Sequence, residues 1–225
     1  NNPCGVASDK TIYSAFVKAL KSDRTSSFGG IVLLNRSVDK KLAKKISQNY
    51  FEIIAAKKFN TDSINILNIK KNLIIINTNN LTSSYKEETR SVFGGQLIQN
   101  RNITKINLKN ITCMSKIKAK KNEISDLIFA LKVAKHVKSN SIVLAKNKQT
   151  IGIGAGQMSR IDAVMIAILK NNDKKNNFVA ASDAFFPFTD GLKILIKNNC
   201  KSIIQPGGSI NDKKIINFAN NNKIS

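Results

Sequence analysis

The 225-residue sequence contains no tryptophan, a single histidine and only three prolines. Its three cysteines, Cys4, Cys113 and Cys200, are odd in number and far apart, so they match neither a metal spacing nor a disulfide framework. No apolar run approaches the ~18 residues that a membrane-spanning helix needs. The motifs G-x-x-x-x-G-K-[ST] and G-x-S-x-G are also missing, which leaves nucleoside triphosphatase and serine hydrolase activities without support. We expect a reducing, cytoplasmic setting.

Acidic residues are scarce, because 14 Asp and Glu stand against 37 Lys and Arg, for a formal net charge of +23. Such a charge favours an anionic partner, such as nucleic acid, a membrane surface or a phosphorylated substrate. Only five of the basic residues are arginine, however, and nucleic-acid surfaces depend on arginine for bidentate contacts. The chain is rich in Lys, Asn and Ile, which an AT-rich genome over-supplies. Compositional drift is therefore the preferred explanation, and an anionic ligand stays open.

Short apolar segments alternate with amphipathic ones along the chain, which predicts an α/β fold. We expect buried strands at FGGIVLL, EIIAA and NLIII, and further strands at RSVFGGQLIQN, SIVLA, TIGIG, FVAAS and SIIQ. Helices are expected after Ser8 or Asp9, after Ser37 and Asp39, over 61–71 with Thr61 or Asp62 as cap, over about 123–138, and from about 159, 190 and 209. A shift in composition near 105–122 divides the chain into two halves, 1–115 and 116–225.

The stretch TIGIGAGQMSR leads from a predicted strand to a helix that begins near Ser159. Its G-x-G-x-G spacing departs from the dinucleotide fingerprint G-x-G-x-x-G, and no acidic residue closes a strand about 20 positions later. The free N–H groups at a helix start favour an anion, whereas the helix dipole disfavours a cation there. Arg160 is therefore expected to face a negative group, either a ligand or the partner of an ion pair.

Three further residues or stretches could belong to a site. Asn140 lies between the long helix and SIVLA, as a helix terminator or as an amide presented at a sheet edge. His136, in the last turn of that helix, is expected to be structural. The stretch SDAFFPFTDG surrounds a proline with three phenylalanines and places Asp183 and Asp190 nearby. We interpret it as a wall with an apolar face and polar edges, with a loop that fills the core as the alternative.

Seven stretches, taken together and in this order, resemble the AICAR transformylase family. They are NPCGVA, SSFGG, RSVFGGQLIQNR, VKSNSIVLAK, TIGIGAGQMSRIDAV, SDAFFPFTDG and IQPGGSIND. In this family the transformylase is the larger domain of a bifunctional purine-biosynthesis enzyme, and the other domain is IMP cyclohydrolase. The resemblance covers essentially the whole chain. It implies two cytidine-deaminase-like α/β halves with three-layer α/β/α character and no zinc, in a homodimer with shared active sites.

The reaction that the resemblance implies is formyl transfer from 10-formyltetrahydrofolate to the 5-amino group of AICAR ribotide. The product, FAICAR, is then closed to IMP by the cyclohydrolase domain. The implied AICAR-binding residues are Gly29, Glu52, Asn140, Arg160 and Phe185. The implied folate-binding residues are Ile161, Asp190, Ser209, Ile210, Phe28 and Phe188.

The resemblance also implies individual roles. Arg160 would hold the nucleotide phosphate, Phe185 would stack on the imidazole, and Asn140 would lie beside the reacting amine and formyl group. Asp183 corresponds to a residue near a potassium (K+) site in some members. The family's catalytic Lys-His pair lies directly ahead of the segment that matches NNPCG, so we expect it just before Asn1.

A family stretch rich in Arg and His is expected beyond Ser225. On this expectation both ends of the chain are cuts, and the 225 residues alone are almost inactive. Neither nucleic acid nor a membrane is expected as a partner. Two alternatives remain, namely a basic α/β protein that binds RNA or another polyanion without catalysis, and a family member that keeps the fold but has lost activity.

Overall fold

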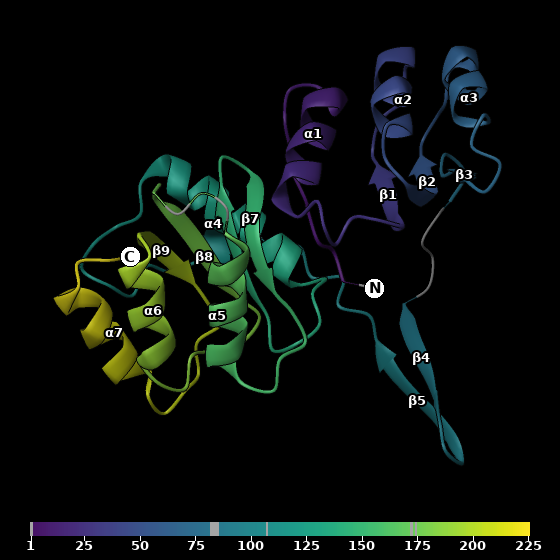
Figure 1. Cartoon of the computed structure of the whole chain (residues 1–225). Helices are drawn as coiled ribbons and strands as arrows, with labels where there is room; N and C mark the ends of the chain where they lie inside the picture. Colours follow the sequence, from purple (N-terminus) through teal and green to yellow (C-terminus); the bar gives the residue numbers. More distant parts are fainter. Residues whose placement is uncertain (1, 82–85, 107, 172, 174) are drawn as a thin grey trace.

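The computed structural model describes residues 2–81, 86–106, 108–171, 173 and 175–225 (Figure 1). They form a parallel sheet of three strands, an antiparallel pair, and a mixed sheet of four strands, with helices packed on the first and third. The α/β class predicted from the alternating sequence pattern is therefore confirmed.

The first lobe is built on the parallel sheet, in the order β1-β2-β3. It comprises β1 (Gly30–Leu34), α2 (Lys40–Ser47), β2 (Phe51–Ala56), α3 (Thr61–Leu67) and β3 (Ile74–Asn77). Both helices cover one face of the sheet, where Leu42, Ile46 and Leu67 are buried. The opposite face leaves Ile31 and Leu33 largely exposed.

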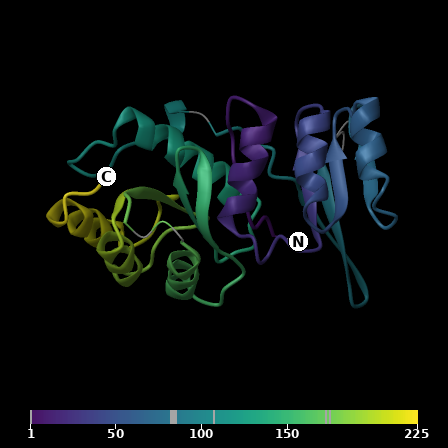
Figure 2. The same cartoon turned by 45° about the horizontal axis from the view of Figure 1, so that its top comes forward.

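The second lobe is built on the four-stranded sheet, in the order β7-β6-β8-β9. It comprises α4 (Lys121–Ala134), β6 (Ile142–Lys146), β7 (Gln149–Gly154), α5 (Arg160–Lys170), β8 (Phe178–Ser182), α6 (Asp190–Lys197), β9 (Cys200–Ile204) and α7 (Asp212–Asn221). Strand β6 is antiparallel to β7 and to β8, and β8 is parallel to β9. Figure 2 shows α4 on one side of this sheet and the green and yellow helices on the other, so this lobe has three layers.

Alternation along β6 explains the two faces. Val143 and Ala145 pack with α4, whereas Ile142 and Leu144 pack with α5 and α6. All four residues are fully buried, as expected for a strand that is covered on both sides.

The helix α1 (Ile12–Ser22) lies between the lobes (Figure 1). Its Phe16 and Leu20 belong to the core of the first lobe, while the segment ahead of it bridges to β7 through Ala7 and Gln149. The N–H of Val6 donates to Thr150 Oγ1 over 2.9 Å. The chain ahead of α1 is thus attached to the sheet of the second lobe.

The stretch RSVFGGQLIQN was predicted as one strand, and this prediction is wrong. It belongs to a hairpin of β4 (Glu87–Val92) and β5 (Gly95–Asn100) that projects from the molecule (Figure 1). The turn residue Gly94 has φ +77°, a conformation that glycine adopts without the steric cost of a side chain. Strand-like sequence continues on both sides of this turn, and one strand was therefore predicted across the reversal. A short 3-10 helix, η1 (Leu108–Asn110), follows.

Several helix ends differ from the predicted ones. The side chain that caps α1 is Thr11, not Ser8 or Asp9, and the N-cap of α3 is Asn60 without a side-chain bond. Helix α4 ends at Ala134, so His136 lies exposed in the turn that follows and not in the last helical turn. Helix α7 begins at Asp212, not at 209. The predicted caps Asp39 and Ser159 are confirmed.

Among the residues described, no helix is long and apolar enough to cross a membrane. Among the same described residues, no group of three or more His, Cys, Asp or Glu side chains could hold a metal ion. The three cysteines are free thiols.

Candidate functional site

One edge of the second-lobe sheet gathers most of the predicted site residues. Because β6 runs antiparallel to β7 and β8, its start lies at the edge where β7, β8 and β9 end. The loops at this edge are 139–141, 155–159, 183–189 and 205–211. The predicted residues on or next to them are Asn140, Arg160, Ile161, Asp183, Phe185, Phe188, Asp190, Ser209 and Ile210.

The centre of this edge is an ion pair between Arg160 and Asp183. Arg160 Nη1 contacts Asp183 Oδ1 and also donates to the carbonyl of Ser141 over 3.4 Å. The same carboxylate oxygen accepts the N–H of Ser141 over 2.9 Å. Only 9% of the Arg160 side chain and 15% of the Asp183 side chain are exposed. The negative group that faces Arg160 is therefore Asp183, in a largely buried pair.

Beside this ion pair, the buried Nε of Arg160 has no partner among the described residues, and neither has the buried Oγ of Ser141. A buried donor that lacks a partner costs free energy, so it favours a ligand that brings an acceptor. Arg160 also begins α5, whose Ser159 cap accepts the N–H of Asp162 over 3.1 Å.

The pKa of Asp183 is set by two opposing effects. Burial opposes ionisation of the carboxylate, but hydrogen bonds from Ser139 and Ser141, together with Arg160, outweigh it and lower the pKa below its usual value. A group whose pKa is lowered by folding stabilises the fold above its unfolded pKa of about 3.9. That contribution is lost as the pH falls through the folded-state pKa.

The variant Asp183→Asn should test this pH dependence. At pH 7 we expect it to lose about 3 kcal/mol of unfolding free energy, because Arg160 remains buried without its counter-charge. As the pH falls below the unfolded value of about 3.9 and through the lower folded-state pKa of Asp183, the wild-type carboxylate takes up a proton, and the difference between the two proteins should shrink. Urea unfolding at pH 7 and pH 3 measures both values, and a difference independent of pH would contradict the assignment.

Asn140 joins the loop before β6 to the loop after β7. Its Nδ2 donates to the carbonyls of Gln157 over 2.9 Å and Met158 over 3.1 Å, and its backbone exchanges hydrogen bonds with Gln157. Because α4 already ends at Ala134, Asn140 is not the terminator of that helix. Its amide lies at the sheet edge, which is the second of the two positions considered from the sequence.

The stretch SDAFFPFTDG divides its phenylalanines between core and surface. Phe186 is 1% exposed, its ring fills the space beside Gly191, and its N–H donates to Gln205 Oε1 over 2.7 Å. Phe185 and Phe188 are 40% and 64% exposed. Only these two rings are available as a wall, so the expectation that the whole stretch forms one was wrong for Phe186.

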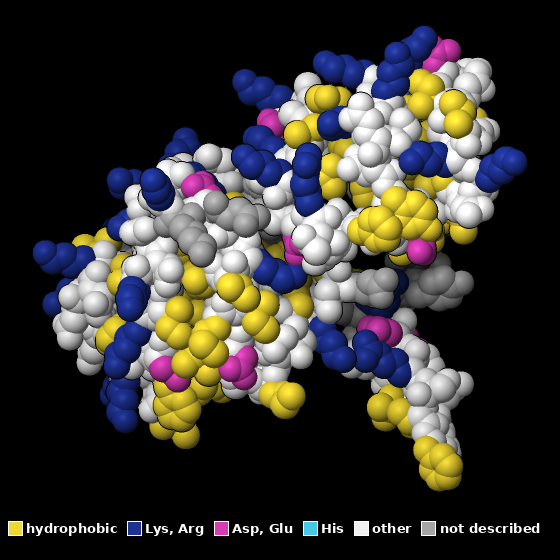
Figure 3. Space-filling model, viewed as in Figure 1, with side chains coloured by type: hydrophobic (Ala, Val, Ile, Leu, Met, Phe, Trp, Pro, Cys, Tyr) yellow, Lys and Arg dark blue, Asp and Glu magenta, His cyan; other side chains and the backbone are white. Residues whose placement is uncertain are grey.

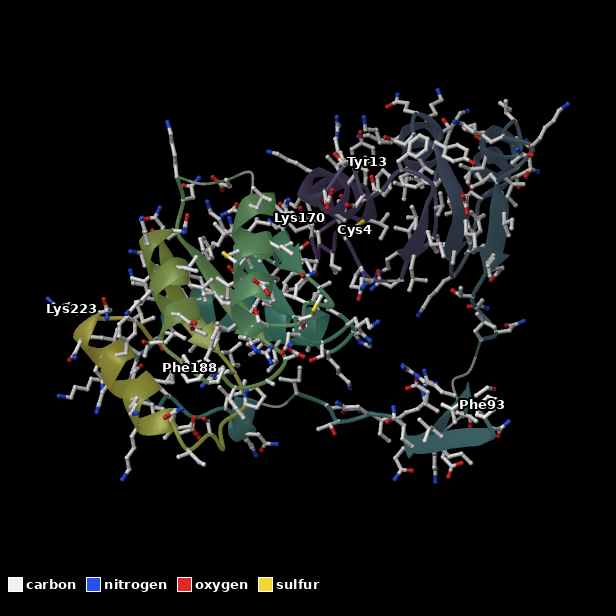
Figure 4. The ribbon with its side chains drawn as sticks, turned by 60° about the horizontal axis from the view of Figure 1, so that its bottom comes forward. Cys4, Tyr13, Phe93, Lys170, Phe188 and Lys223 are labelled. Carbon is white, nitrogen blue, oxygen red and sulfur yellow. The ribbon has the colours of Figure 1, made fainter. Side chains whose placement is uncertain are left out.

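A second loop lies against this wall. Asn211 Nδ2 donates to the carbonyl of Pro187 over 2.9 Å, and Ser209 Oγ accepts the N–H of Asn211 over 3.1 Å. Ile210 is fully exposed. Exposed apolar side chains gather over this end of the lobe with acidic groups beside them (Figure 3), and Phe188 is labelled there in Figure 4. The loop pair therefore presents an apolar surface beside polar atoms.

The remaining predicted residues, Phe28, Gly29 and Glu52, lie at the amino ends of β1 and β2. The rings of Phe28 and Tyr50 are 5.1 Å apart, and a Cβ on Gly29 would lie 3.5 Å from Glu52 Oε1. Among the described residues, no hydrogen bond or ion pair joins this group to the Arg160 edge. Figure 1 shows the two places apart. One copy of the chain thus presents two separate groups of predicted residues.

The sequence reasoning did not identify Ser141, Gln205 and Asn211, which hold the loops of this edge together. The available signal was a polar residue at the end of a predicted strand. Polar residues at such positions meet when the strand ends lie at the same edge of the sheet. The antiparallel direction of β6 was needed to know which ends coincide.

The fold and this edge define an α/β domain with a candidate ligand site built from strand-end loops and one helix start. A family model described as "AICARFT/IMPCHase bienzyme" matches residues 1–170. The chain belongs to this family.

Curated relatives support this membership. Each of the following is described as "Bifunctional purine biosynthesis protein PurH". The protein of Acetivibrio thermocellus is 42% identical over 222 residues, which is 97% of this chain and 43% of the relative. Those of Caldicellulosiruptor saccharolyticus and Fusobacterium nucleatum are each 45% identical over 227 aligned positions, covering 100% of this chain and 44% of the relative. The chain therefore spans less than half the length of the relatives it matches.

Proposed function

We propose that this chain provides the binding edge of an AICAR formyltransferase, which moves a formyl group from 10-formyltetrahydrofolate to AICAR ribotide in purine biosynthesis. One observation carries the proposal: a family member presents a buried guanidinium, with an unpartnered Nε, at the start of a helix. That arrangement suits a phosphate, because the helix start and the arginine both favour an anion. A purely polyanion-binding role rests on net charge alone and is not supported by the family match.

For AICAR ribotide, we assign the phosphate to Arg160 and the stacking surface to Phe185. The exposed ring of Phe185 offers an apolar face to the imidazole. Asn140 is assigned to the reacting amine and formyl group, since its amide lies at the same edge as Arg160. Gly29 and Glu52 complete the nucleotide site in this proposal.

For the folate, we assign the apolar surface to Phe188, Phe28, Ile161 and Ile210. Phe188 and Ile210 are both exposed, and their loops are joined by the Asn211–Pro187 hydrogen bond. Polar edges come from Asp190 at the start of α6 and from Ser209. Such a surface matches a ring system with polar substituents.

The reaction joins the 5-amino nitrogen of AICAR ribotide to the formyl carbon, and the bond from that carbon to N10 of the folate breaks. The amine loses a proton and N10 gains one, so tetrahydrofolate leaves. Holding both substrates in line can supply ~7–11 kcal/mol of the barrier. In the proposal the family's Lys-His pair moves the proton and stabilises the oxyanion, while the residues of this chain bind and orient.

The wider assignments are also proposals. We infer two cytidine-deaminase-like halves, 1–115 and 116–225, a protein that also carries IMP cyclohydrolase activity, and a homodimer with shared sites. Separation of the Phe28–Glu52 group from the Arg160 edge supports sites shared between copies. The Ala7–Gln149 bridge connects the two halves through the first residues of the chain.

A potassium ion at Asp183 fits this structure poorly. Asp183 Oδ1 already faces the Arg160 guanidinium and accepts the N–H of Ser141. A second cation at that oxygen would be repelled by the first. The proposed mechanism therefore makes no use of potassium.

Formyl transfer by the complete reading frame that contains these residues is the direct test. We expect turnover with AICAR ribotide and 10-formyltetrahydrofolate, measured as tetrahydrofolate release. Asn140→Ala should lower kcat about 100-fold, because both the loop tether and the amide beside the reacting atoms are lost. Asn122→Ala, at the exposed start of α4, is the matched control and should leave kcat unchanged. Binding of AICAR ribotide without turnover would favour a family member whose chemistry is lost.

A further inference from the structure

An ion pair outside the site described above lies at the junction between the two lobes. Lys170, the last residue of α5, contacts Asp23 with 2.8 Å between Nζ and Oδ2. Asp23 directly follows α1, and only 13% of its side chain is exposed. Figure 4 shows Lys170 labelled close to Cys4, where α5 approaches α1. The pair therefore connects the second lobe to the chain that leads into β1.

Asp23 also organises the loop that follows it, residues 23–29. Its carboxylate accepts the N–H of Ser26 over 2.9 Å and the Oγ of Ser26 over 2.7 Å. Lys170 Nζ reaches the same Ser26 Oγ at 3.4 Å. Burial raises the pKa of Asp23, but the bonds to Lys170 and Ser26 outweigh it and lower the pKa below its usual value. The carboxylate is thus charged and held from both sides.

The organised part of the 23–29 loop continues to the predicted binding residues. Phe28 N–H donates to the carbonyl of Thr25, and Gly30 N–H donates to that of Ser27. Consecutive turns therefore connect Asp23 to Phe28 and Gly29 without a long free segment. Because Lys170 and Arg160 are the two ends of the same helix, α5 links the loop to the Arg160 edge.

We propose that Lys170 is a positioning residue for the reaction, because its ammonium group holds the 23–29 loop against the second lobe and so places Phe28 and Gly29 for the substrates. This inference rests on the proposed formyl transfer. It predicts an effect on substrate affinity, because Lys170 itself lies away from the reacting atoms. The chemical step should be little changed.

Steady-state kinetics of the complete reading frame test the inference. Lys170→Met should raise the KM for AICAR ribotide about fivefold, with kcat within twofold, and Lys170→Arg should restore the wild-type KM. Asp23→Asn keeps an acceptor for the Ser26 N–H but removes the charge, and it should also raise KM about fivefold. Because the two groups act through one contact, the double variant should again show about fivefold and not 25-fold.

A matched control is available in the same lobe. Lys146 pairs with Asp173 over 3.0 Å, and the exposed fraction of its side chain, 28%, is close to the 39% of Lys170. Lys146→Met removes one paired lysine without touching the 23–29 loop, so KM should stay unchanged. Equal effects of Lys146→Met and Lys170→Met, or no effect of Lys170→Met, would overturn the inference.

Amide hydrogen exchange on the protein encoded by the complete reading frame separates this inference from the proposed function. The N–H groups of Gly29 and Gly30 are bonded to Tyr50 and Ser27. Lys170→Met should speed their exchange about tenfold, and Lys146→Met should not. If Lys170→Met speeds this exchange but the protein shows no formyl transfer, the hold of Lys170 on the 23–29 loop is supported and the proposed function is refuted. If the wild-type protein turns over normally but Lys170→Met leaves the exchange unchanged, only the role of Lys170 is refuted. Should Lys170→Met fail to fold, Asp23→Asn gives the same readout.

Discussion

Replacing Arg160 with methionine should lower the affinity for AICAR ribotide at least 100-fold. The guanidinium is held by Asp183 and Ser141, and its Nε is free for a phosphate oxygen. Loss of a buried, charge-assisted contact to phosphate corresponds to about 3 kcal/mol. Arg160→Lys keeps the charge but not the planar fork, so it should still bind at least 10-fold more weakly than wild type. Isothermal titration calorimetry with AICAR ribotide measures both constants.

Two controls separate binding from folding in this experiment. Arg160→Met alone leaves Asp183 buried without a partner, so the double variant Arg160→Met with Asp183→Asn should recover stability but not affinity. Lys197→Met removes an exposed charge from α6 in the same lobe and should change the dissociation constant less than twofold. If Lys197→Met weakened binding as much as Arg160→Met, the affinity for AICAR ribotide would depend on overall charge and not on this site.

The substitution Gly154→Ala should destabilise the protein by at least about 4 kcal/mol. A Cβ on Gly154 would overlap the carbonyl oxygen of Ala163, and one on Gly152 would overlap that of Ala167. These glycines let α5 lie directly on β7, and therefore hold Arg160 at the sheet edge. A domain of this size should lose at least about 10 °C in Tm, which circular dichroism can follow.

Gly95→Ala is the matched control for that substitution. A Cβ there would meet nothing within 4 Å, so the change in stability should stay within about 0.5 kcal/mol. Ala163→Gly should not rescue Gly154→Ala, because the overlapping atom belongs to the backbone of residue 163. A Gly154→Ala protein with a normal Tm would mean that α5 and β7 lie farther apart than described.

Local chemistry allowed much of the secondary structure to be predicted. The caps Asp39 and Ser159 bond to N–H groups three residues later, so their effect is visible within one turn of chain. Buried strands such as β6 and β8 are continuous apolar runs, which predicts burial on both faces. The hairpin of β4 and β5 was missed because one strand was predicted across its turn, and the first half of β4 lies in the polar sequence ahead of that stretch.

The candidate site could be predicted only in part. Resemblance to the family selected its residues, and strand ends explain why nine of them share one edge. Which phenylalanine fills the core was not visible from the sequence, because Phe185, Phe186 and Phe188 have the same chemistry and differ only in surroundings. The partner of Arg160 was expected to be negative, but its identity as Asp183 depends on the order β7-β6-β8.

By itself, the sequence determined the α/β class, the positions of most strands and helices, the family and the residue types available for an anionic substrate. These properties depend on periodicity and on motifs within a few residues of each other. Tertiary structure alone decided the Arg160–Asp183 pair and the Lys170–Asp23 pair, which join positions 23 and 147 residues apart. Contacts over such separations arise only after strand order and direction place distant segments together, and no local pattern encodes that arrangement.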